Sequence, residues 1–312
     1  MMYLYDKIKN DVKTLLLRCN LPLKYAHSIT EESIDNLVLT IYGDVIAYAH
    51  KDPAKHGSED IVYHNTMSFS AVFHYRIANF LYYLDNSNIY PTQLKAIAED
   101  LSNIGKRLSG IEIHPAARIG TNFVIDHGAG TVIGETAIVG NDCYFLQGIV
   151  LGARGIANNP NGKRHPTIGN NVEIGAFVKI LGDINVGDNV KISPNSIITN
   201  DIPSNSIVRI VNQYQTLKYA QSVVSEISAI VPDKKGLLVF GKYFSYSVSC
   251  YFWINESTYD MDYEIINDNI MLLQYPVIQK EEKISQTAIL FKQNDYLISA
   301  IFGIHNLLPV LN

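Results

Sequence analysis

The 312-residue sequence has only three cysteines, Cys19, Cys143 and Cys250, and they lie far apart. An odd number of widely spaced cysteines supports neither a disulfide framework nor a zinc cluster, and it favours a reducing compartment. The chain also lacks a run of the roughly 18 apolar residues that a membrane span needs. Charged residues interrupt its first 20 residues, which therefore lack the apolar centre of a signal peptide. We expect a cytoplasmic protein without a membrane span.

The chain also has no excess of basic over acidic residues. The chain carries 25 Lys and Arg against 30 Asp and Glu, which gives a formal net charge of -5. Such a balance would not compensate a phosphate backbone, so a nucleic-acid partner is not expected. With 47% hydrophobic and 18% charged residues the composition is that of a globular protein. Any anionic ligand must therefore be met by local basic groups.

Residues 1–110 show the apolar spacing of amphipathic helices. Between residues 31 and 45 apolar residues recur every three or four positions, and Thr30 stands before two glutamates as a candidate N-cap. Two more helices are predicted, one from Ser68 and one from Thr92, which follows Pro91 and ends near Gly110. We expect residues 1–110 to form an α-helical N-terminal domain.

From residue 111 onward the apolar residues instead recur every six positions. Thirteen residues follow this rule in three registers: Ile113, Ile119 and Ile125; Ile133, Val139, Phe145 and Leu151; Ile168, Ile174, Ile180, Val186, Ile192 and Ile198. A hexapeptide period is typical of a parallel β-helix, in which each hexapeptide forms one face and three complete a coil. The alternative is a sandwich of strands rich in glycine and isoleucine. We predict a β-helix over residues 111–203 with these side chains inside.

The repeat is broken twice. Ile133 follows Ile125 by eight positions, and Ile168 follows Leu151 by 17, which leaves the loop GARGIANNPNGKRHP outside the coils. The first break contains Asp126 and His127. Because loops carry chemistry more often than regular coils do, the breaks are where we expect a functional site.

Beyond the repeat, the segment YQTLKYAQSVVSEISAIV predicts a helix, so residues 204–231 are expected to form a helix and linker. Residues 232–312 are rich in β-branched and aromatic residues and predict a strand-rich C-terminal region. They contain no motif that indicates a function.

Three histidine sites lie in or beside the repeat: Glu112 with His114, Asp126 with His127, and Arg164 with His165. A histidine with a carboxylate partner can act as a general base near neutral pH. The alternatives are corner residues that serve stability alone, or a histidine-bound zinc site, although the expected spacing of three ligand histidines is not evident. Location at the breaks favours catalysis for the second and third sites.

Basic residues gather around the second break: Arg154, Lys163, Arg164, Lys179 and Lys191. They could hold a phosphate-bearing cofactor that lies along the coils. The alternative for each residue is a solvated surface charge.

Several segments resemble the serine O-acetyltransferase family from about Asp52 to Ile202: IEIHPAARIG, IDHGAGTVIGETAIVG, LQGIVLGA, KRHPTIG and IGAFVKILGDINVGDNVKI. Upstream, KDPA and FHYRIANFL look like the helical-domain motifs of that family. The resemblance implies an α+β fold, with an α-helical N-terminal domain and a left-handed parallel β-helix, to which this chain adds a strand-rich C-terminal region.

The resemblance also implies a reaction, the transfer of acetyl from acetyl-CoA to the hydroxyl of L-serine for cysteine biosynthesis. Carried over by motif, His127 is the general base and Glu112, where the family often has Asp, is its orienting carboxylate. The residues implied to hold the amino acid are Asp52, Asp126, Arg164 and His165, and His165, beside the hydroxyl, is also implied to be catalytic. Those implied to hold acetyl-CoA are Ala153 and Ala176 at the pantetheine arm and Lys191 at the phosphate end. No metal is required.

Such sites lie between neighbouring β-helices, so the resemblance implies a homotrimer in which a neighbour's KRHP loop closes over Asp126 and His127. The family's usual dimer of trimers is the alternative. The loop of residues 152–166 is longer than the usual one, and IPSNSIVRIVNQY lacks the common Gly-x-Pro-Ala closing segment. The family's short tail is replaced by roughly 100 residues, so a complex with cysteine synthase is not expected.

Two other functions stay open. The longer loop and the C-terminal region would suit an O-acyltransferase for another hydroxyl amino acid or a carrier-bound acceptor. The third possibility is a non-catalytic oligomerising scaffold.

Overall fold

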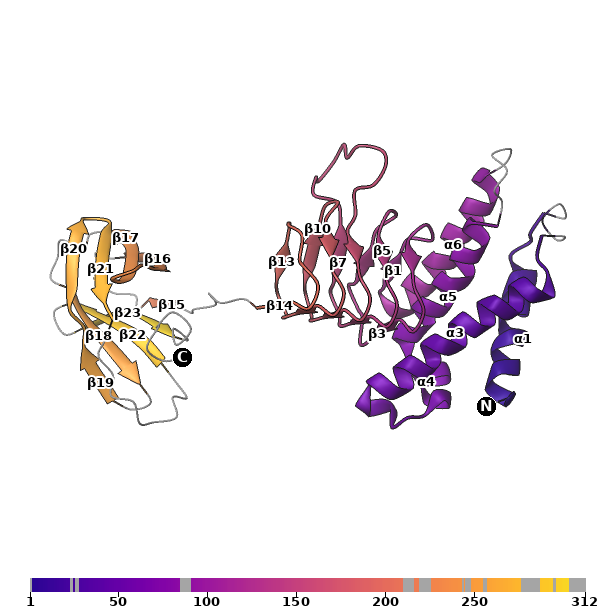
Figure 1. The fold of residues 1–312 in the computed structure, drawn as a ribbon, viewed down its shortest axis with the longest axis horizontal. Coiled ribbons are helices and arrows are strands. Elements are labelled where there is room, and N and C mark those ends of the chain that lie inside the picture. The colour runs from indigo at the N-terminus through magenta and orange to yellow at the C-terminus, as the bar shows by residue number, and fades with distance from the viewer. Residues whose placement is uncertain are drawn as a thin grey trace. The chain divides into compact units, whose positions relative to one another are not determined.

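The computed structural model describes residues 2–22, 25, 28–84, 91–209, 216–218, 226–242, 244, 248–254, 257–275, 287–293 and 296–302. The chain divides into two compact units, residues 1–209 and residues 210–312 (Figure 1). Every residue that the sequence proposes for the functional site lies in the first unit. No helix among the described residues has the length and apolar character needed to cross a membrane.

The first unit begins with helices α1 (Met2–Arg18), α3 (Glu31–Lys51), η1 (Pro53–Lys55), α4 (Glu59–Asn65), α5 (Met67–Tyr82) and α6 (Pro91–Ser109). The predicted N-cap is confirmed, because the Thr30 side chain accepts a hydrogen bond from the backbone N–H of Ser33, and the Ser33 side chain in turn accepts one from the backbone N–H of Thr30. Helices α5 and α6 begin within a residue of the predicted starts at Ser68 and Thr92.

After the helices the chain winds through short strands: β1 (Glu112–Ile113), β2 (Arg118–Ile119), β3 (Val124–Ile125), β4 (Val132–Ile133), β5 (Ile138–Val139), β6 (Tyr144–Phe145), β7 (Val150–Gly152), β8 (Thr167–Ile168), β9 (Glu173–Ile174), β10 (Lys179–Leu181), β11 (Asn185–Val186), β12 (Lys191–Ile192), β13 (Ile197–Ile198) and β14 (Ile207–Val208). They form three parallel sheets. Face A contains β1, β4, β7, β10 and β13; face B contains β2, β5, β8 and β11; face C contains β3, β6, β9, β12 and β14. The strands from β1 to β13 visit faces A, B and C in turn, so the predicted parallel β-helix is confirmed.

All thirteen residues of the hexapeptide pattern lie in these strands, and all are buried except Ile119, which is half-buried. A second set of interior side chains stands two positions before them and includes Phe123, Cys143, Ile149 and Val178. Each coil therefore contributes both strand and corner residues to one continuous core.

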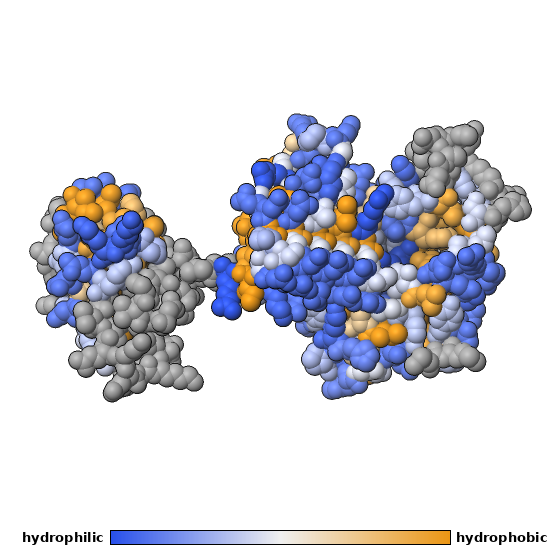
Figure 2. Space-filling view, in the orientation of Figure 1, coloured by the Kyte–Doolittle hydropathy of each residue, from blue (hydrophilic) through white to orange (hydrophobic). Residues whose placement is uncertain are grey.

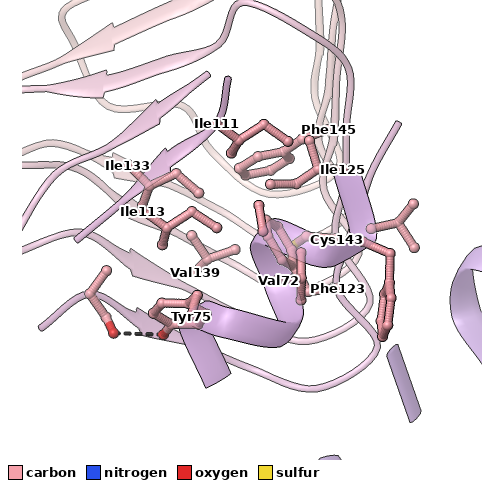
Figure 3. Packing of buried hydrophobic residues seen from close by; sticks show 14 of the residues in the cluster. Val72, Tyr75, Ile111, Ile113, Phe123, Ile125, Ile133, Val139, Cys143 and Phe145 are labelled. Atoms are coloured by element: carbon pink, nitrogen blue, oxygen red, sulfur yellow. Dashed lines mark hydrogen bonds between the residues drawn. The ribbon is translucent and has the colours of Figure 1, made fainter. Parts of the chain in front are cut away.

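That core continues into the helices. Figure 3 shows Val72 and Tyr75 of α5 among Ile113, Phe123 and Val139 of the coils. The Tyr75 hydroxyl donates to the carbonyl of Ala117 at 2.7 Å. The helical and β-helical parts thus pack as one body.

A buried ion pair also joins helices to the first coil. Arg76 of α5 makes a two-pronged contact with Asp44 of α3, at 2.8 and 3.0 Å. The same guanidinium donates to the carbonyls of Ile119 and Gly120, while Asp44 accepts from the backbone N–H of Phe123 at 2.8 Å. Every polar edge of the pair is therefore used, as a buried charge requires.

The described part of the second unit is made of strands: β15 (Thr216–Lys218), β16 (Glu226–Pro232), β17 (Gly236–Lys242), β18 (Val248–Ile254), β19 (Ser257–Asp260), β20 (Tyr263–Asn267), β21 (Ile270–Gln274), β22 (Thr287–Gln293) and β23 (Tyr296–Phe302). They form antiparallel sheets in the orders β15-β23-β22-β18-β19 and β16-β17-β21-β20. Side chains from both sheets share one core, which contains Leu237, Val239, Phe252, Ile289 and Phe291.

The helix predicted between residues 214 and 231 is wrong over the described residues. Thr216–Lys218 and Glu226–Pro232 are strands, and residues 219–225 lie outside the described part. β16 forms a hairpin with β17, and residues 233–235 are its turn, closed where Asp233 and Gly236 exchange backbone hydrogen bonds. The side chain of Ile230 is buried and that of Val231 is exposed, which is the alternation expected in a strand. Pairing with β17 therefore outweighs the local preference of this segment for a helix.

Candidate active site

The first break in the repeat widens the corner between faces C and A. Other coils turn this corner with a single residue at positive φ, namely Gly148, Phe177 or Asn195. The widened corner has three such residues, His127 at 60°, Gly128 at 75° and Gly130 at 78°. A histidine in the left-handed region is uncommon and costs conformational energy, which is a frequent property of functional sites.

The extra residues turn His127 outward while its neighbours stay packed. A Cβ on Gly128 would come within 2.4 Å of the Ile111 side chain, so the backbone lies tight against the core. The side chain of His127 is 74% exposed, whereas that of Asp126 is 19% exposed. The structure therefore presents an imidazole at the surface above a partly covered carboxylate.

The Asp126 carboxylate has one firm partner. Its Oδ2 accepts a hydrogen bond from the Tyr144 hydroxyl at 2.9 Å and lies 3.8 Å from Nε2 of His127. Burial, the bond to Asp126 and the negative charge of Asp52 raise the pKa of Tyr144 above its usual value. We call these residues the Asp126 corner: Asp52, Asp126, His127 and Tyr144. Tyr144 was absent from the sequence-based candidates.

Asp52 is buried at the junction of α3 and η1. Its Oδ1 accepts from the N–H of Ala54 at 2.9 Å, and its Oδ2 lies 3.4 Å from the ammonium of Lys55. The carboxylate therefore caps η1, and its negative charge acts on the Tyr144 hydroxyl.

The second break leaves face A after β7 and returns to face B at β8, and its loop projects beyond the coils (Figure 1). Thr136 fastens the returning end. Its Oγ1 accepts from the backbone N–H groups of Arg164 and His165, at 3.0 and 3.1 Å. We call this set the His165 corner: Glu135, Thr136, Arg164 and His165.

The tautomer of His165 follows from its neighbours. The backbone N–H of Thr136 can only donate, and it points to Nδ1 of His165 at 3.1 Å, so the ring proton is on Nε2. Burial, together with the positive charges of Arg164 and Lys163, lowers the pKa of His165 to about 4. At neutral pH this ring is uncharged and offers an Nε2–H donor.

Arg164 forms an ion pair with Glu135, and this hydrogen bond holds the pKa of the Glu135 carboxyl below its usual value. Glu135 and Thr136 were not among the sequence-based candidates, although both lie in the segment IDHGAGTVIGETAIVG. They occupy regular positions of a coil, where the sequence shows no break.

Glu112 is bound elsewhere in the single chain. Its Oε2 lies 2.5 Å from the ammonium of Lys106 on α6. No hydrogen bond or ion pair joins Glu112 to His127 in residues 91–209, all of which are described. The predicted orienting role of Glu112 stays a prediction.

The residues proposed for acetyl-CoA are spread over the prism. Ala153 directly follows β7 at the corner between faces A and B, and Ala176 lies between β9 and β10 at the corner between faces C and A. Lys191 projects from face C, where its ammonium is 3.0 Å from Glu173. Within the described residues no three His, Cys, Asp or Glu side chains are grouped as metal ligands.

The two corners therefore flank face A from opposite sides. The chain enters face A from the Asp126 corner and leaves it at the His165 corner. No hydrogen bond or ion pair links them within the described part of one chain.

A parallel β-helix wound from hexapeptides places this chain in the class of hexapeptide-repeat proteins. The model of bacterial transferase hexapeptides (six repeats) matches residues 165–200. The serine acetyltransferase of Staphylococcus aureus is 39% identical over 165 residues, which cover 53% of this chain and 72% of that protein. The chain belongs to the serine acetyltransferase family.

Other relatives are covered less completely. The serine acetyltransferase of Synechococcus elongatus is 41% identical over 170 residues, 54% of this chain and 64% of that protein. The chain thus spans just under two thirds of this relative. Among solved structures, serine acetyltransferase isoform 3 of Entamoeba histolytica, in complex with cysteine, has a TM-score of 0.52 at 30% identity and covers 72% of this chain and 73% of that chain.

Proposed function

We propose that this protein is a cytoplasmic serine O-acetyltransferase that transfers acetyl from acetyl-CoA to L-serine, giving O-acetyl-L-serine for cysteine biosynthesis. One observation carries the proposal. The side chain of His127 points outward beside Asp126, on a backbone in the left-handed region, at the point where a regular repeat is interrupted. Family membership supports the same reaction, and with it a left-handed winding of the coils.

In the proposed mechanism His127 is the general base. A serine hydroxyl has a pKa far above 7, so the imidazole takes its proton as the oxygen attacks the thioester carbonyl. The tetrahedral intermediate then collapses, the C–S bond breaks, and the imidazolium returns the proton to the CoA sulfur. Glu112, released from Lys106, would orient and stabilise the imidazolium.

The acceptor would be held from both corners. Asp52 and Asp126 suit its ammonium group, and Arg164 suits its carboxylate through a bidentate contact. Because Glu135 already pairs with Arg164, the substrate would share or displace that ion pair. The uncharged His165 would offer its Nε2–H to the reacting oxygen.

Acetyl-CoA is proposed to lie along the coils without a metal. Backbone groups at Ala153 and Ala176 would meet the pantetheine arm, and Lys191 would meet a phosphate while remaining close to Glu173. Ala176 lies on the same edge of the prism as the Asp126 corner and Ala153 on the same edge as the His165 corner, whereas Lys191 lies on face C.

This division leads us to infer a homotrimer in which the Asp126 corner of one subunit meets the His165 corner of the next. The outward positions of face A include Val132, Val150 and the 65% exposed Ile197. At the corner between faces C and A, Phe177 is 54% exposed. Figure 2 shows an apolar band between polar areas on the β-helix. Burying such side chains between subunits is favourable.

The reaction is tested by CoA release from acetyl-CoA with a panel of hydroxyl-bearing acceptors. We expect release with L-serine. If CoA is released only with another hydroxyl amino acid or a carrier-bound acceptor, that compound and not serine is the substrate. No release with any acceptor would favour a non-catalytic scaffold and contradict the proposal.

The shared site is tested by mixing two inactive variants, His127→Ala and Arg164→Ala, through co-expression. Random mixed trimers should regain about a quarter of wild-type turnover, because one neighbouring pair in four combines two intact corners. Arg164→Ala mixed with His165→Ala is the matched control and should regain nothing, since both changes affect the same corner. Equal activity in both mixtures would contradict a site shared between subunits.

A further inference from the structure

Tyr144 lies one coil away from the widened corner and reaches into it. It occupies the outward position of β6, in register with Val124 of β3, and Asp126 follows β3 directly. The Tyr144 hydroxyl donates to Oδ2 of Asp126 at 2.9 Å. The same oxygen faces Nε2 of His127 at 3.8 Å, which is too long for a hydrogen bond.

One carboxylate oxygen thus has two possible partners, and the phenol holds it. Tyr144 is a lasting donor, because burial and the neighbouring carboxylates raise its pKa. Three lysines of the helices already have partners: Lys55 faces Asp52, Lys106 faces Glu112, and Lys51 donates to the carbonyl of Asp142. Among the described residues, the partner that then remains for Oδ2 of Asp126 is the His127 imidazole, at 3.8 Å.

We propose that Tyr144 is a positioning residue, whose hydroxyl holds the Asp126 carboxylate away from His127. Two consequences follow. The carboxylate stays available to a ligand ammonium, and Nε2 of His127 stays unpaired and able to accept a proton. The holding contact itself is independent of the reaction, whereas its effect on turnover rests on the proposed function.

Removing the Tyr144 hydroxyl tests whether it keeps the Asp126 carboxylate away from His127. In Tyr144→Phe the ring and its packing remain, but Oδ2 of Asp126 loses its donor. The carboxylate is then expected to move onto His127 and to favour the tautomer that carries the proton on Nε2.

Nitrogen-15 NMR of the histidine rings in the ligand-free full chain reports this tautomer. In spectra recorded at about pH 8.5, two units above the reference pKa of a free histidine side chain, Tyr144→Phe should increase the share of the His127 ring that carries its proton on Nε2. The same change made in an Asp126→Asn background should have no effect. The proposal would be overturned if Tyr144→Phe left the tautomer of His127 unaltered. It would also be overturned if the tautomer shifted equally in the Asp126→Asn background.

Kinetics test the catalytic consequence with the same variants. We expect kcat/KM for L-serine to fall roughly tenfold in Tyr144→Phe, the scale of a hydrogen bond to a charged group, and to fall no further when Asp126 is already Asn. Tyr42→Phe is the matched control, because Tyr42 also donates to a carboxylate, Glu59 at 2.7 Å, on α3 and α4. A wild-type kcat/KM in Tyr144→Phe would overturn this consequence.

The two measurements keep the proposals apart. If the wild-type chain acetylates no acceptor, the proposed function fails, yet the NMR spectra still decide whether Tyr144 holds Asp126.

Discussion

Replacing His127 by alanine is expected to lower kcat for L-serine acetylation by at least about 100-fold, the usual contribution of a general base. The serine hydroxyl would then have to lose its proton to water during the attack. KM should change much less, because the acceptor is proposed to bind through Asp52, Asp126 and Arg164. Steady-state CoA release at saturating serine measures the effect.

The fold should tolerate this change, since the His127 side chain is 74% exposed. We expect an unaltered unfolding midpoint and an unaltered oligomer in size-exclusion chromatography with light scattering. His56→Ala is the matched control, because His56 is also exposed and also has a left-handed backbone, with φ 51°. If His127→Ala kept near-normal turnover while remaining folded, another group would have to be the base.

The coils could be predicted because the sequence pattern that specifies them is local. A period of six assigns each aliphatic residue to the interior without reference to distant contacts, and the strands β1 to β13 end at or directly after those residues. The helix predicted near residue 226 failed for the opposite reason. There the pairing of Ile230 with Val239 on a neighbouring strand decides the structure, and the sequence shows no regular pattern of such pairs.

The site was predictable where it interrupts the repeat and hidden where it does not. Asp126, His127, Arg164 and His165 stand at the two breaks. Thr136 and Tyr144 occupy ordinary outward positions, and their contacts depend on which coil lies next to which. Thr136 meets His165 from 29 positions away, and Tyr144 meets Asp126 from 18. Only the register between coils brings these pairs together.

The largest effect on stability is expected at Arg76. Replacing it by methionine should lower the free energy of unfolding of the first unit by about 3–5 kcal/mol, the cost of leaving one charge of a buried pair without its partner. Asp44 would remain fully buried with the N–H of Phe123 as its donor, and the carbonyls of Ile119 and Gly120 would lose theirs. The helices would keep their apolar contacts with the coils and their remaining side-chain hydrogen bonds, such as that of Tyr75 to Ala117.

A surface pair provides the matched control for this variant. Lys13→Met removes the contact between Lys13 and Glu31, which are 36% and 68% exposed, and should cost less than about 1 kcal/mol. Both variants keep the long aliphatic side chain while losing the charge. Equal losses in the two variants would mean that burial does not set the energy of the Asp44 pair.

The full chain contains its own reference for the measurement. Circular dichroism at 222 nm during urea unfolding follows the helices, all of which, among the described residues, lie in the first unit. The single tryptophan, Trp253, lies on β18 of the second unit, so its fluorescence follows that unit. In Arg76→Met the helical transition should move to lower urea while the tryptophan transition stays in place. A joint shift of both would show that the two units unfold together, and a static helical transition would mean that the buried pair contributes little to the junction of helices and coils.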